Sequence, residues 1–124
     1  MPDDNMYFGL NGPVTDIATE VISGSFALGA GPAIASAQQQ NCTIAYTGVG
    51  IYTVTLYKTF TALNCATATV QSTANDDKIA SIAATDVVTA KTIILHVRDI
   101  SGAALTDIAT DGSQRVNFHF VLVK

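Results

Sequence analysis

Few side chains in this chain could take part in chemistry, and His96 and His119 are the first candidates. They are the only histidines. Two histidines together with an aspartate can bind a transition metal, so a metal site is one interpretation. The interpretation we favour is that each histidine is an ordinary strand residue that faces away from the apolar side of its strand. We therefore expect neither a metal nor a cofactor.

The acidic pairs Asp3-Asp4 and Asp76-Asp77 are the next candidates. Calcium takes six or more oxygen ligands, whereas neighbouring side chains on an extended chain point in opposite directions. Each pair is therefore expected to be a solvated turn. Glycoside hydrolysis needs a carboxylate pair in a sugar groove, and this chain has no tryptophan and only one glutamate, Glu20. The nucleophile, zinc-protease and phosphate-loop motifs are also missing, so we expect that the protein is not an enzyme.

Cys42 and Cys65 are the only cysteines. Two thiols this far apart in the sequence form neither a zinc cage nor a CxxC redox pair. Free cysteine is among the most buried residue types, so two buried and reduced thiols are expected. A disulfide between them is the less favoured alternative, because both residues lie at the margins of predicted strands.

The charge content is the most informative property of the composition. The 124 residues suit one domain, and charged residues make up only 13% of them, against roughly 25% in a typical domain. From Val21 to Asn75, Lys58 is the only charged residue. A surface rich in Thr, Ser, Ala and Gly loses little hydration energy when it is covered. The composition therefore indicates a subunit that buries its surface against copies of itself or a larger assembly.

Charge and hydropathy also exclude several classes of partner. The net charge is −4, and the six Lys and Arg residues are scattered, which argues against binding to nucleic acid. No run approaches the roughly 18 apolar residues of a membrane helix. The acidic start of the chain lacks the basic and apolar regions of a signal peptide, so synthesis in a cytoplasm is expected.

Residues 1–13 are predicted to form an N-terminal arm. This arm carries a short apolar patch of four residues, namely Met6, Tyr7, Phe8 and Leu10. The breaker Asn11-Gly12-Pro13 follows the patch. The patch either binds a neighbouring molecule or packs onto its own domain, and both remain open. We take its four residues as the candidate interaction site.

Residues 14–124 are predicted to form a single all-β domain, an antiparallel β-sandwich or jelly-roll-like fold. Alternation of apolar and polar residues predicts strands over 42–46, 51–57, 66–72, 87–97 and 115–123. The less regular segments are a strand over 23–28 broken at Gly24, an irregular segment or short strand over 14–22, a loop over 29–40, and short strands or loops over 79–86 and 103–111. Short strands separated by turn signals at regular spacing are typical of sandwiches. The last strand is apolar on both faces, so we expect it in a central position or against a partner subunit.

Four segments carry a resemblance to a known group of proteins. They are GVGIYTVTL at 48–56, ATATVQ at 66–71, TIILHV at 92–97 and VNFHFVLV at 116–123. In this order they resemble the small β-sandwich virion proteins of tailed bacteriophages, which are capsid decoration (cement) proteins and related fibre modules. The resemblance covers roughly residues 42–124 and includes no catalytic residue.

The resemblance implies a structural protein on the capsid surface of a virion. Such a protein binds the major capsid protein and stabilises the head shell, and the resemblance implies a homotrimer. The alternative is a fibre-tip or head-fibre adhesin that binds a receptor on the host surface. Interface cores often hold aromatic residues, so Tyr46 and Tyr57 join the arm as candidates, whereas Tyr52 is expected in the core.

Overall fold

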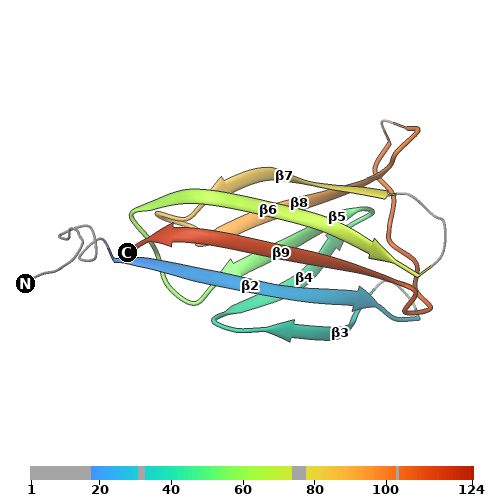
Figure 1. Ribbon diagram of the computed structural model, residues 1–124, viewed down its shortest axis with the longest axis horizontal. Coiled ribbons are helices and arrows are strands. Elements are labelled where there is room, and N and C mark those ends of the chain that lie inside the picture. The colour runs from blue at the N-terminus through green and yellow to red at the C-terminus, as the bar shows by residue number, and fades with distance from the viewer. Residues whose placement is uncertain (1–17, 31–32, 74–77, 103) are drawn as a thin grey trace, which may run out of the picture.

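The computed structural model describes residues 18–30, 33–73, 78–102 and 104–124. The predicted arm and both acidic pairs lie outside these ranges. Within them the chain forms eight strands and no helix: β2 (Thr19–Leu28), β3 (Ile34–Gln39), β4 (Cys42–Gly48), β5 (Ile51–Leu56), β6 (Ala62–Ser72), β7 (Lys78–Asp86), β8 (Thr92–Asp99) and β9 (Gln114–Val123). The strands form two antiparallel sheets that pack face to face (Figure 1). The predicted antiparallel β-sandwich is therefore confirmed.

Each sheet contains four strands. The first sheet has the order β3-β2-β9-β6, and the second has the order β4-β5-β8-β7. Strands that follow each other in the chain pair within one sheet in three cases, namely β2 with β3, β4 with β5, and β7 with β8. The final strand β9 lies between β2 and β6. The central position expected from its two apolar faces is therefore confirmed.

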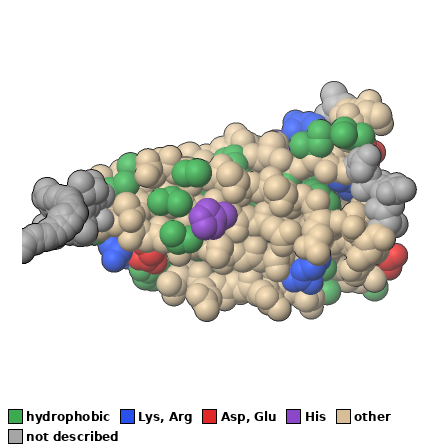
Figure 2. Space-filling model, in the orientation of Figure 1, with side chains coloured by type: hydrophobic (Ala, Val, Ile, Leu, Met, Phe, Trp, Pro, Cys, Tyr) green, Lys and Arg blue, Asp and Glu red, His purple; other side chains and the backbone are tan. Residues whose placement is uncertain are grey.

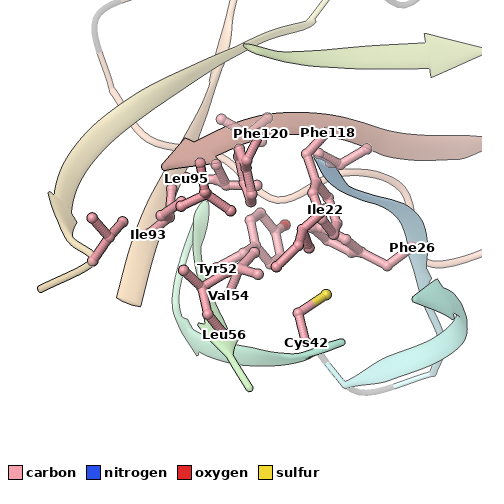
Figure 3. Packing of buried hydrophobic residues seen from close by; sticks show 14 of the residues in the cluster. Ile22, Phe26, Cys42, Tyr52, Val54, Leu56, Ile93, Leu95, Phe118 and Phe120 are labelled. Atoms are coloured by element: carbon pink, nitrogen blue, oxygen red, sulfur yellow. The ribbon is translucent and has the colours of Figure 1, made fainter. Parts of the chain in front are cut away.

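The core lies between the sheets and follows the predicted alternation. On β5, the side chains of Tyr52, Val54 and Leu56 are at most 1% exposed. The Tyr52 ring lies 4.9 Å from the ring of Phe26 on the opposite sheet, and Figure 3 shows both within the same packed layer. The smaller residues of β6 lie at the margin of this core and are only partly buried. Large side chains thus fill the centre of the core and small ones its edge.

The prediction of a loop over residues 29–40 is wrong for its second half, because Ile34–Gln39 forms β3. Alanine, serine and glutamine give this segment little intrinsic preference for a strand. Its backbone pairs with β2, from Leu28 opposite Ile34 to Gly24 opposite Gln39, and this pairing stabilises the strand. Backbone hydrogen bonding to a strongly β-forming neighbour thus overrides weak propensity.

Gly24 does not break β2, contrary to expectation, since Thr19–Leu28 is one continuous strand. A Cβ atom at this position would lie 2.6 Å from the carbonyl oxygen of Gln38 and 2.7 Å from the ring of Phe118. The glycine therefore permits close packing of β2 against its neighbours β3 and β9. Close packing and a strand break give the same sequence signal.

The strand predicted over 87–97 begins later, at Thr92, and the preceding residues form a turn. Val87 is nevertheless buried, and its carbonyl oxygen accepts a hydrogen bond from the Phe60 amide at 2.8 Å. Its apolar side chain therefore serves the core from a turn. The segment over 79–86, predicted as a short strand and loop, belongs to β7 throughout.

Candidate functional site

A band without charged residues surrounds the middle of the sandwich. The eight strands contain six Asp, Glu, Lys and Arg residues, and each lies within two residues of a strand end: Glu20, Lys78, Asp86, Arg98, Asp99 and Arg115. Figure 2 shows one face, where blue and red side chains lie toward the two ends of the molecule. Ser, Thr, Ala and Val occupy much of the intervening outer surface. This charge-free band distinguishes the described surface from that of an ordinary domain, where charged residues are mostly exposed along the strands as well as at their ends.

The predicted arm residues Met6, Tyr7, Phe8 and Leu10 lie outside the described residues. The end of the domain to which the arm connects is described, and we call it the terminal end. There the Lys124 amide donates to the carbonyl oxygen of Ala18 at 2.7 Å, and the Thr61 hydroxyl donates to the carbonyl oxygen of Lys124 at 3.0 Å. The described part of the chain thus begins and ends side by side (Figure 1).

Tyr57 and its neighbours form the main side-chain cluster of the terminal end. The Tyr57 hydroxyl donates to Glu20 Oε1 at 2.8 Å, and this bond, followed by burial, raises the pKa of Tyr57. Lys58 Nζ lies 5.5 Å from the centroid of the Tyr57 ring and 5.1 Å from that of Phe60, in the range of cation–π contacts. Because Tyr57 remains 48% exposed, this cluster presents an aromatic surface to solvent.

Asp107 organises the opposite end of the sandwich. It accepts hydrogen bonds from the Tyr46 hydroxyl at 3.0 Å and from the Gly50 amide at 2.7 Å. The Tyr52 hydroxyl lies 3.4 Å from the same carboxylate and accepts a hydrogen bond from the Ile108 amide at 3.3 Å. Burial is the main cause that raises the pKa of Tyr52 far above its usual range. These bonds attach the loop before β9 to the β4–β5 turn, so we interpret them as structural.

This geometry divides the tyrosines proposed as interface candidates. Tyr52 is 0% exposed, so its predicted position in the core is confirmed. Tyr46 is partly buried, and its hydroxyl is committed to Asp107. Tyr57 alone of the three presents much of its ring to solvent.

The two histidines lie on different sheets. His96 on β8 pairs with Ile51 and Ser81, whereas His119 on β9 pairs with Ser23 and Thr67. Each lies on the outer face of its sheet, so the core separates the two imidazoles and one metal ion cannot bind both. Among the described residues, no group of three or more metal-ligating side chains gathers anywhere.

The cysteines differ from each other, and the expectation of two buried thiols is wrong for one. Cys42 on β4 is buried, which raises the pKa of its thiol, whereas Cys65 on β6 is exposed. Both are free. Cys65 pairs with Val121, which directs it to the outer face of the first sheet. This orientation continues the alternation of the predicted strand over 66–72, because Cys65 lies on the same face as Thr67 and Thr69. The expectation of burial rested on residue type alone.

Sequence reasoning missed both Asp107 and the Glu20–Tyr57 pair. Each contact joins residues that are far apart in the chain and that meet only through the packing of the two sheets. Asp107 lies in a segment predicted only as a short strand or loop. No motif marked these residues, because their role depends on tertiary neighbours and not on local spacing.

Within the described residues there is no helix that is long and apolar enough to cross a membrane.

Comparison with known proteins identifies no relative. No family model matches the chain, and neither a curated protein nor a solved structure is significantly similar to it.

Proposed function

We propose that this protein is a structural component of a tailed-phage virion that decorates the head shell. In this role it binds the major capsid protein, as a homotrimer on the capsid surface, and raises the stability of the shell. A ligand that binds the closed shell and not its open form stabilises it by mass action. The proposed role is structural and not catalytic.

The charge-free band is the observation that carries this proposal. A decoration protein contacts shell subunits over large areas, and the cores of such interfaces are depleted in charged residues. In the described strands, every charged residue lies near a strand end, so the middle of each sheet loses little hydration energy when it is covered. The resemblance of four segments to decoration proteins supports the same role.

The terminal end supports a part for the arm in attachment. The described chain starts at this end, beside the exposed ring of Tyr57. An arm that carries Met6, Tyr7, Phe8 and Leu10 therefore joins the domain next to an aromatic surface. We propose that these four residues and Tyr57 contact the shell together.

A binding assay with isolated heads tests this proposal. Heads that lack the protein are mixed with the full chain, with a chain that lacks residues 1–10, and with a chain in which the four apolar arm residues are serine. The serine variant keeps the arm at full length and so separates side-chain contacts from tethering. We expect the full chain to sediment with the heads, and both variants to bind at least tenfold more weakly.

All three chains are expected to give the same far-UV circular dichroism, because the core lies within residues 18–124. Failure of the full chain to bind any head would contradict the decoration role. Equal binding of all three would leave that role intact and remove the arm from it.

The fibre-adhesin role remains the second candidate, and one observation favours it. The end opposite the termini exposes Val49 by 57% and Ile100 by 61%, on turns that a receptor could reach. Replacement of both residues by serine would then abolish binding to host cells and leave binding to heads unchanged.

A further inference from the structure

Four strands form the edges of the two sheets, namely β3 and β6 in the first sheet and β4 and β7 in the second. Among the described residues, no strand is hydrogen-bonded to the outer side of any of them. Three of the four, β3, β4 and β6, contain no charged residue and no proline. Monomeric proteins usually protect such edges with lysine, proline or a covering segment, because the free backbone groups recruit another strand.

The two sheets are also staggered at their edges. On β3, Ala37 lies opposite Phe26, which is fully buried on the inner face, yet Ala37 itself is exposed. On β7, Thr85 lies opposite the buried Ile93 and is likewise exposed. Figure 1 shows β3 along one long margin and β7 along the other. Each sheet therefore projects beyond the other on one side, with part of its inner face uncovered.

We propose that these staggered edges join one copy of the chain to the next. In this interface, which we call the joint, β3 of one copy pairs with β6 of the next copy, and β4 pairs with the next copy's β7. The projecting inner face of β3, with Ala37, then covers the inner side of β7, where Ala80 and Ile82 are only partly buried. A second copy of this chain is thus the partner that the surface fits.

Strand directions agree with this joint at both of its contacts. Within each sheet every neighbouring pair is antiparallel, and each sheet has four strands, so its two edge strands run in opposite directions. When copies are placed side by side in the same orientation, β3 meets β6 antiparallel, and β4 meets β7 antiparallel. Both sheets are thus continued by regular antiparallel pairing.

The chemistry of the facing strands also agrees. Natural sheets block edge pairing with charged side chains, and here the charges of β7 lie only at its two ends, Lys78 and Asp86. The joint uses different surfaces on the two copies, so it is heterologous and either closes into a ring or continues as a chain. A closed ring of three copies is the homotrimer proposed above. The joint itself does not depend on a role in the virion, because it is measured on the purified protein.

Charged substitutions on exposed positions test the joint. One variant carries Ala37→Lys and Gln39→Lys on β3, and the other carries Thr85→Lys on β7. These three positions are exposed, so the fold is expected to persist, and Ala37 and Thr85 lie on the projecting inner faces that the joint would cover. The matched control is Val21→Lys with Ser23→Lys, which places two lysines at the same spacing on exposed positions of the central strand β2.

Sedimentation velocity on the full-length chains provides the measurement. We expect the unmodified chain and the β2 control to sediment as the same oligomer, and each edge variant to sediment as a monomer of 12.9 kDa. An equimolar mixture of the two edge variants is expected to give a dimer and nothing larger. Each variant retains the edge that the other has lost, so one joint forms per pair.

Every other pattern would overturn the proposal. If the unmodified chain is monomeric at all concentrations, the joint does not form. Oligomers that survive in either edge variant alone would indicate an isologous contact through the unmodified edge. Loss of assembly in the β2 control would move the interface to the sheet face. Circular dichroism of each variant separates a blocked edge from a lost fold.

Discussion

At the scale of single residues, Asp107 has the most consequential contacts in the described structure. Its carboxylate accepts hydrogen bonds from the Tyr46 hydroxyl and the Gly50 amide and lies beside the Tyr52 hydroxyl. The acceptor therefore satisfies groups from two strands and one turn. A bond to a charged acceptor contributes about 1.5–3 kcal/mol, more than a neutral one.

Replacement of Asp107 by alanine is expected to lower the free energy of unfolding by about 3 kcal/mol, because it leaves partly buried donors without an acceptor. Tyr46→Phe should cost about 1.5 kcal/mol in the natural chain and almost nothing in the alanine variant. Urea denaturation of the four chains measures the coupling. An equal cost of Tyr46→Phe in both backgrounds would contradict the assigned bond.

Tyr52 gives a prediction about pH. Its pKa is raised above the ordinary value of 10.0, mainly by burial. Above pH 10 the unfolded chain therefore loses this proton before the folded chain does, so stability is fully present below that pH and falls as the pH rises. The slope from one such proton is about 1.4 kcal/mol per pH unit.

The comparison with Tyr52→Phe isolates this slope from other groups. Below pH 10 the natural chain is expected to be the more stable, because the phenylalanine variant lacks the hydroxyl that accepts from the Ile108 amide. Above pH 10 this advantage is expected to shrink. Urea denaturation at several pH values would contradict the argument if the difference between the two chains stayed constant up to pH 11.

At the scale of elements, two glycines with positive φ differ in what surrounds them. Gly50, with φ of 67°, would place a Cβ atom 2.7 Å from the carbonyl oxygen of Val97 and 2.8 Å from the Thr106 amide nitrogen. Gly112, with φ of 85°, has no atom within 4 Å of a Cβ atom built there. The first turn is constrained by packing as well as by backbone conformation.

Gly50→Ala is therefore expected to cost about 3 kcal/mol or more, and Gly112→Ala about 1 kcal/mol, which is the conformational cost alone. Thermal unfolding of the two variants beside the natural chain measures the difference. Similar losses of stability in the two variants would contradict this expectation, because they would mean that the atoms around Gly50 move aside at no cost.

Predictability of the elements followed the strength of local alternation. The strands β5 and β9 alternate between large apolar and polar residues, so the sequence alone predicted their buried faces. The strand β3 was missed because alanine and glutamine give no alternation, and only its pairing with β2 makes it a strand. The start of β8 was predicted too early because the apolar Val87 was taken as a strand residue. Val87 instead packs into the core from a turn.

The candidate site was less predictable than the fold. Composition identified a surface poor in charge, but its arrangement as a band depends on which residues lie at strand ends. The partners of Asp107 follow from sheet packing, which a single sequence does not encode locally. The exposure of Cys65, by contrast, agrees with the alternation of β6, and it was missed because the usual burial of free cysteine was given more weight than that pattern.

At the scale of the whole molecule, the protein is a small, well-packed sandwich in which the charged residues of the strands lie away from the middle of each sheet. Its staggered edges are the surfaces that we propose to meet other copies. Both features agree with the proposal that the protein is a building block of a larger particle.

Gold labelling of the protein on intact virions, viewed by electron microscopy, tests this central claim most directly. Virions of the proposed source phage are incubated with an antibody against residues of the sandwich and a gold conjugate, and virions that lack the protein serve as the control. The account predicts label spread over the head surface of the natural virions alone. Label confined to a tail or fibre tip, or no label above the control, would contradict it.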